Sequence, residues 1–104
     1  MNMNKPRELD NLVENYFGQD YDVIDDSDEI GPKIEAYNTH SSKSMQIALL
    51  EDIEEFLALG EQLNVIFKDR YSSYFLPELW GTTPRDFLLL AKDKVVADIV
   101  RRER

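Results

Sequence analysis

Apolar residues recur at steps of three and four along most of this sequence, and this periodicity constrains the fold more than any other feature. The clearest stretches are residues 9–17, 45–57, 63–71 and 87–99. Such steps place apolar side chains on one face of an α-helix, whereas a strand requires alternation with a period of two. No segment alternates over more than a few residues. We therefore predict an all-α fold, a compact single-domain bundle of about five helices over residues 1–104.

Glycine, proline and small polar residues separate the predicted helices. Gly18 follows the first helix and Gly60 marks the end of the third, because glycine readily adopts the left-handed backbone that closes many helices. A second, shorter helix opens within 27–32, whose proline can occupy a first turn but not a helix interior. The segment 72–82 breaks the periodicity, and we expect a buried aromatic loop or a short turn of helix there. Thr83 caps the last helix, with a proline directly after it.

The composition is that of one globular core in a strongly acidic chain. With 104 residues, 42% of them hydrophobic, the chain is long and apolar enough for a single core. Asp and Glu outnumber Lys and Arg by 21 to 12, and the net charge of −9 argues against nucleic acid or an anionic membrane as a partner. There is no Cys, which excludes disulfides and thiolate metal sites. No secretion signal or membrane-spanning run is present, so we expect a cytoplasmic location.

A run of carboxylates between residues 20 and 29 is the most unusual feature of the charge pattern. Six of these ten residues are acidic and none is basic. They are Asp20, Asp22, Asp25, Asp26, Asp28 and Glu29. Such a run repels itself, so it suits a solvated loop, a cation site or a surface for a basic partner. We interpret it as a surface that binds a basic partner, with a solvated helix start and acidity for solubility alone as the alternatives.

A second acidic surface is predicted on the third helix, opposite its apolar face. Glu51, Asp52 and Glu55 lie there. Glu51 and Glu55 are like charges four residues apart, which costs an isolated helix roughly 0.2–0.5 kcal/mol. We therefore predict a second ridge for the basic partner, although a solvated helix face explains the same pattern. Tight complexes also need buried anchors, for which Tyr21 and Tyr37 are the candidates.

Residues suited to catalysis or metal binding are sparse. His40 is the one histidine, and it stands in a polar turn without the partners of a usual zinc site. An EF-hand calcium loop read from Asp26 fails at Ile30, which has no side-chain oxygen, and at Tyr37, which occupies the glutamate position. No phosphate-cradling loop or serine-nucleophile motif is present. We expect a protein that is not an enzyme, with no catalytic residue, no cofactor and no metal site, and leave open a weak divalent-ion contact at the acidic run.

Four segments together form a recognisable pattern. Residues 16–21, YFGQDY, match a Tyr-Phe-x-Gln-Asp-aromatic signature directly after an amphipathic helix. The others are the acidic, leucine-rich segment 50–57, the Tyr-x-x-Pro turn at 74–77 and the Gly-Thr helix start at 81–88. With this layout the sequence resembles, over residues 9–99, a family of bacterial immunity proteins that accompany contact-dependent growth inhibition systems.

The resemblance implies a cytosolic antidote that binds the toxic C-terminal domain of a large exported protein, often a nuclease, and keeps it from its substrate. We accordingly expect a monomer in a 1:1 complex with a cognate toxin, made through the acidic residues and tyrosines named above. Nucleases are generally basic because they hold polyphosphate, so carboxylates would steer the encounter. Two alternatives remain at this point: an acidic helical adaptor or regulator of another basic protein, and a metal-dependent enzyme. The neighbouring gene tests the first, and calorimetric titration with calcium and magnesium tests the second.

Overall fold

The structure, a computed structural model, describes residues 7–17 and 30–103. Over these residues the chain forms five α-helices and two short 3-10 helices, and no strand. The elements are α1 (Glu8–Tyr16), α3 (Ile30–His40), α4 (Lys43–Leu57), η1 (Gly60–Gln62), α5 (Leu63–Tyr71), η2 (Pro77–Trp80) and α6 (Pro84–Arg102). The all-α prediction is confirmed. The acidic run at 20–29, together with Tyr21, lies outside the described residues.

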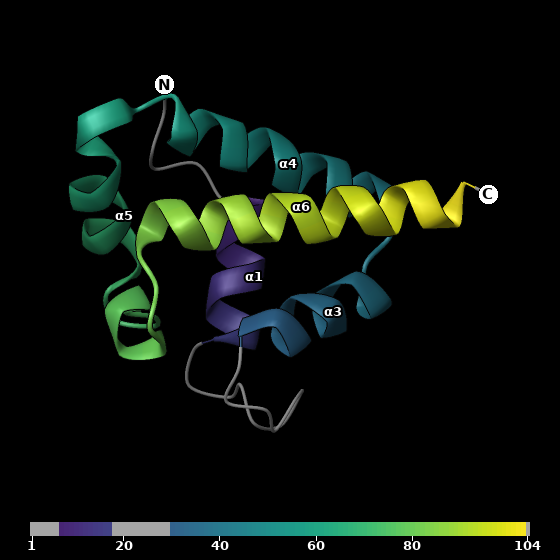
Figure 1. The fold of residues 1–104 in the computed structure, drawn as a ribbon, viewed down its shortest axis with the longest axis horizontal. Helices are drawn as coiled ribbons and strands as arrows, with labels where there is room; N and C mark the ends of the chain where they lie inside the picture. The colour runs from purple at the N-terminus through teal and green to yellow at the C-terminus, as the bar shows by residue number, and fades with distance from the viewer. Residues whose placement is uncertain (1–6, 18–29, 104) are drawn as a thin grey trace.

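Helix α6 crosses the front of the molecule in Figure 1, and the other helices are arranged around it. It packs against α3, α4 and α5, with α4 along one side and α3 along the other. Helix α1 lies behind α6 and contacts α3 and α4. Each helix turns its apolar stripe towards the space between them. The fully buried core includes Leu9, Leu12, Val13, Ile34, Leu49, Ile53, Phe87, Leu88, Ala91 and Val95.

Aromatic rings fill the end of the core where α5 meets the start of α6. Phe67 is fully buried, and its ring centroid lies 4.9–6.3 Å from those of Phe56, Tyr71, Phe75 and Phe87. Edge-to-face arrangements such as these add stabilisation beyond the burial of area. Phe75 belongs to the segment 72–82 and is only 2% exposed, and that segment contains the short helix η2. The prediction of a buried aromatic loop or a short turn of helix is confirmed for the short turn and for Phe75, whereas Tyr74 is 44% exposed.

The helix boundaries show which local signals were decisive. The Ser42 hydroxyl accepts a hydrogen bond from the backbone of Met45 at 3.2 Å, and this cap begins α4. Thr83 caps α6 in the same way, as predicted. Gly60 does not end α4 itself, because α4 ends at Leu57 and the chain continues through a turn. Gly60 instead opens η1 with a φ of 62°, a left-handed conformation that favours glycine.

Candidate partner-binding surface

Asp52, one of the residues predicted to face a partner, holds helix α1 in place. Its side chain is 13% exposed, and it accepts a hydrogen bond from the backbone N–H of Leu9 at 3.1 Å. This amide belongs to the first turn of α1, whose N–H groups have no partner within the helix. Burial raises the pKa of Asp52, although the bond from Leu9 and the charge of Arg7 lower it in part. Asp52 therefore has a structural role in joining α1 to α4.

Arg7 explains why the acidic side of α4 is less negative than its sequence. Its guanidinium is buried, forms an ion pair with Glu55 and lies 3.6 Å from a carboxylate oxygen of Asp52. It also lies over the ring of Phe56, with 5.6 Å between the guanidinium carbon and the ring centroid. Two of the three carboxylates predicted on α4 thus neutralise a cation from the same chain. The Glu55 side chain nevertheless keeps 41% of its surface exposed.

Glu51 is the most accessible of the predicted carboxylates on α4. It is exposed, and it forms no ion pair within residues 7–17 and 30–103. Its neighbour Glu54 was not among the predicted contact residues, is also exposed, and pairs with Lys92 of α6 at 2.5 Å. Ile47, Leu50, Glu51 and Glu54 line an open hollow of about 570 Å³ together with Asp52 and Glu55. This side of α4 offers a partner both carboxylates and an apolar floor.

Tyr37 lies inside the core instead of on the surface. Its side chain is fully buried, and its hydroxyl donates to the Glu8 carboxylate at 2.8 Å. Its ring packs edge to face against Tyr16, with centroids 5.7 Å apart. Burial, followed by the hydrogen bond to Glu8, raises the pKa of Tyr37 far above its ordinary value. A contact anchor needs an exposed ring, so the structure does not support that role and we leave Tyr37 out of the proposed surface.

Helix α6 has an exposed apolar side that the sequence reasoning missed. Leu89, Val96 and Val100 are 41%, 40% and 47% exposed, and their spacing places them on one face of the helix. Asp93 lies on the same face, one turn from both Leu89 and Val96. The adjacent apolar pairs Val95–Val96 and Ile99–Val100 were the signal for this side in the sequence. Neighbouring residues of a helix point in different directions, so one member of each pair faces the core and the other faces solvent.

Ion pairs at both ends of α4 join it to α6, and the two helices are antiparallel. Lys92 pairs with Glu54, and Glu103 pairs with Lys43. This register places Ile47 of α4, which is 45% exposed, level with the last two turns of α6. We use the name α4/α6 face for the exposed surface formed by Ile47, Glu51, Leu89, Asp93, Val96 and Val100. Its apolar residues have the carboxylates of Glu51 and Asp93 beside them, and Lys92, whose charge Glu54 neutralises, lies one turn from both Leu89 and Val96.

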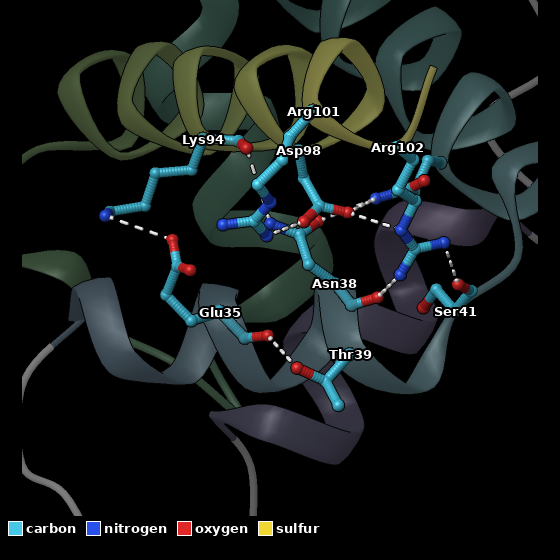
Figure 2. Close-up of polar contacts among 9 residues, drawn as sticks. Glu35, Asn38, Thr39, Ser41, Lys94, Asp98, Arg101 and Arg102 are labelled. Carbon is cyan, nitrogen blue, oxygen red and sulfur yellow. Dashed lines mark hydrogen bonds and ion pairs between the residues drawn. The ribbon is translucent and has the colours of Figure 1, made fainter. Parts of the chain in front are cut away.

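A buried polar cluster holds α6 against α3 and α4 (Figure 2). The Asp98 side chain is 4% exposed, accepts a hydrogen bond from Gln46 of α4 at 2.8 Å and forms an ion pair with Arg102 at 2.9 Å. Arg102 also donates to the carbonyls of Asn38 and Ser41 at the end of α3, the latter at 2.9 Å. Burial raises the pKa of Asp98, but bonds from Gln46 and Arg101 and the charge of Arg102 outweigh it and leave this pKa below its ordinary value. The cluster fixes the position of α6.

The fold and this surface define a small helical binding domain whose exposed face carries apolar and acidic residues. No group of three metal-ligating side chains occurs within the described part of the chain. None of the helices described is long and apolar enough to cross a membrane. The family model for the CdiI immunity protein matches residues 5–95, and the chain therefore belongs to the CdiI immunity protein family. Comparison with curated proteins and with solved structures gave no match.

Proposed function

We propose that this protein protects its cell by binding the toxin domain of a contact-dependent growth inhibition system and covering the substrate site of that domain. The observation that carries the proposal is the family match over residues 5–95, which spans α1 to α5 and most of α6. In this proposal the protein acts in the cytoplasm, as a monomer that forms a 1:1 complex with the toxin domain. It inhibits by binding, without catalysis of its own and without a cofactor, nucleic acid or membrane.

The charge of the chain supports a basic toxin, such as a nuclease. The net charge is −9, and Glu51 presents a carboxylate that no described residue neutralises. A nuclease holds polyphosphate with cationic side chains, so an inhibitor can place carboxylates where phosphates would bind. The proposed contact residues are Asp20, Tyr21, Asp22, Asp25, Asp26, Asp28, Glu29 and Glu51. Asp52 and Glu55 add to the negative field although both are paired with Arg7.

Co-expression with the toxin domain encoded beside this gene tests the proposal directly. Cells that make the toxin domain alone are expected to stop growing, and cells that also make this protein are expected to survive. The two proteins are expected to co-purify as a 1:1 complex, and the purified complex is expected to lack the toxin's activity. Continued killing, with no complex, would refute the proposal and would favour the alternative, an acidic adaptor or regulator of another basic protein.

Stopped-flow binding at low salt tests the role of the acidic run. Neutralising Asp22, Asp25 and Asp26 together with asparagine is expected to slow association by roughly tenfold or more, because steering acts on the association rate. The control neutralises three exposed carboxylates elsewhere, with the changes Glu14→Gln, Glu61→Gln and Asp69→Asn. Both variants lose the same net charge, so an equal association rate for the two would refute a local role for the run.

A further inference from the structure

The exposed apolar residues of this protein are concentrated on one face. Of the eight large hydrophobic residues exposed in the described chain, Ile47, Leu89, Val96 and Val100 lie on the α4/α6 face, and Leu90 lies beside it on α6. Single exposed apolar residues are normal on a protein surface, whereas a contiguous apolar patch with a polar border marks an interaction site. Val96 and Val100 are neighbours one turn apart on α6, and Leu89 lies two turns before Val96 with Asp93 between them, so the three residues span about 16 Å at the helical rise of 1.5 Å per residue.

The α4/α6 face is also held in a fixed shape. On the inner side of α6, Phe87, Ala91 and Val95 are fully buried, and Asp98 is bonded to Gln46 of α4. On the solvent side, the ion pairs from Lys92 to Glu54 and from Lys43 to Glu103 link α6 to both ends of α4. A surface that is already ordered loses little conformational entropy on binding, so more of the contact energy appears as affinity.

The charges around the face indicate what kind of surface it fits. Glu51 follows Ile47 by one turn of α4, and Asp93 lies between Leu89 and Val96 on α6. Neither carboxylate has an ion-pair partner in the described part of the chain. A second copy of this acidic chain would meet like charges on this face. A partner with Lys or Arg beside an apolar centre would instead neutralise them.

We infer that the α4/α6 face is the energetic centre of the complex, and that the toxin domain places on it an apolar patch bordered by basic side chains. This inference rests on the proposed function and assigns the contact to a particular face. Most affinity in such complexes comes from a few buried apolar anchors, and the surrounding charges chiefly set orientation and association rate.

The test compares two pairs of identical substitutions. Leu89→Ser with Val96→Ser removes two apolar side chains from the α4/α6 face. The control, Leu79→Ser with Val65→Ser, removes the same side chains at positions that are 81% and 71% exposed and lie on η2 and α5. The face variant is expected to bind the toxin domain at least ~30-fold more weakly, mainly through faster dissociation, and the control within about threefold of the wild type. Thermal unfolding of each variant alone establishes that both are folded.

A second comparison keeps the inference testable if the serine variant does not fold. Glu51→Lys with Asp93→Lys reverses two charges on the face, and Glu61→Lys with Asp69→Lys reverses two exposed charges elsewhere. The face reversal is expected to abolish protection in the co-expression assay while the control still protects. If wild-type protein binds the toxin and the face variants bind equally well, the inference is wrong and the proposed function stands. If wild-type protein neither binds nor protects, the proposed function fails. If the wild type alone is a dimer that the face variants separate, the face joins two copies and the inference is overturned.

Discussion

Replacing Asp98 with alanine is expected to lower the free energy of unfolding by about 3 kcal/mol, because it removes the centre of the cluster that joins α6 to α3 and α4. Asp98 accepts a hydrogen bond from Gln46 at 2.8 Å and forms an ion pair with Arg102 at 2.9 Å. A hydrogen bond to a charged group contributes about 1.5–3 kcal/mol, and a donor left buried without a partner adds its own penalty. Gln46 is fully buried and cannot turn to water, so its amide keeps only the hydrogen bond to Asn38 at 3.0 Å, whereas the Arg102 side chain is 37% exposed and can reach water. We therefore place the loss near the lower end of the range of about 3–5 kcal/mol for broken buried pairs.

Urea denaturation followed by circular dichroism measures this loss, and Asp93→Ala is its control. Asp93 is the same residue type on the same helix, but it is exposed and has no ion-pair partner in the described chain. Its replacement is expected to change the free energy of unfolding by less than about 0.5 kcal/mol. For a chain of this length, a loss of about 3 kcal/mol lowers the Tm by at least ~10 °C. An Asp98→Ala protein within about 1 kcal/mol of the wild type, at an unchanged denaturant slope, would show that the cluster does not hold α6.

Two further predictions concern a helix cap and acid stability. Ser42→Ala removes the cap of α4 and is expected to lower the free energy of unfolding, measured by urea denaturation, by about 1 kcal/mol. The control Ser44→Ala changes an exposed serine in the first turn of the same helix and is expected to leave that free energy unchanged. Equal losses in the two proteins would refute the role of the cap. Burial raises the pKa of Asp98 and also that of Asp10, a residue of α1 that accepts hydrogen bonds from Arg70 and Tyr71 of α5. In both cases the hydrogen bonds outweigh burial and leave the pKa below its ordinary value, so the stabilisation is complete above the unfolded pKa of about 3.9 and is lost as the pH falls through the folded values. The stability difference between wild type and Asp98→Ala is therefore expected to be constant from pH 5 to 7 and to shrink below about pH 4, and a difference that persists at pH 2 would contradict the assignment. Asp52, whose pKa burial raises, acts in the opposite direction, since its contribution is largest at low pH and is lost as the pH rises.

The helices could be predicted from the sequence because their signals are local. The apolar stripes of α1, α4, α5 and α6 each depend on residues within one helix, and the cap at Thr83 depends on residues directly beside it. The end of α4 was predicted less well, since Gly60 uses its positive φ in the turn that follows the helix. Local patterns therefore determine where the helices form, within a few residues at their ends.

The candidate surface was harder to predict because it depends on contacts between distant residues. Arg7 and Glu55 are 48 positions apart, so nothing near Glu55 in the sequence indicates that a cation of the same chain pairs with it. Tyr37 and Glu8 are likewise separated by 29 positions, and their hydrogen bond places in the core a ring that the sequence left free to be exposed. For helix α6, the buried stripe at residues 87–99 was predicted correctly, but the second, exposed apolar side of the helix was not.

The position of α6 in the chain has a consequence for the newly made protein. It is the last helix along the described chain, yet it packs against α3, α4 and α5 and supplies Phe87, Leu88, Ala91 and Val95 to the core. Until α6 leaves the ribosome, the earlier helices can pack only against one another, and the apolar side chains that α6 covers stay exposed. Folding of the core therefore waits for α6, and a ribosome that stalls before α6 emerges leaves a chain that exposes part of its core to proteases and to aggregation.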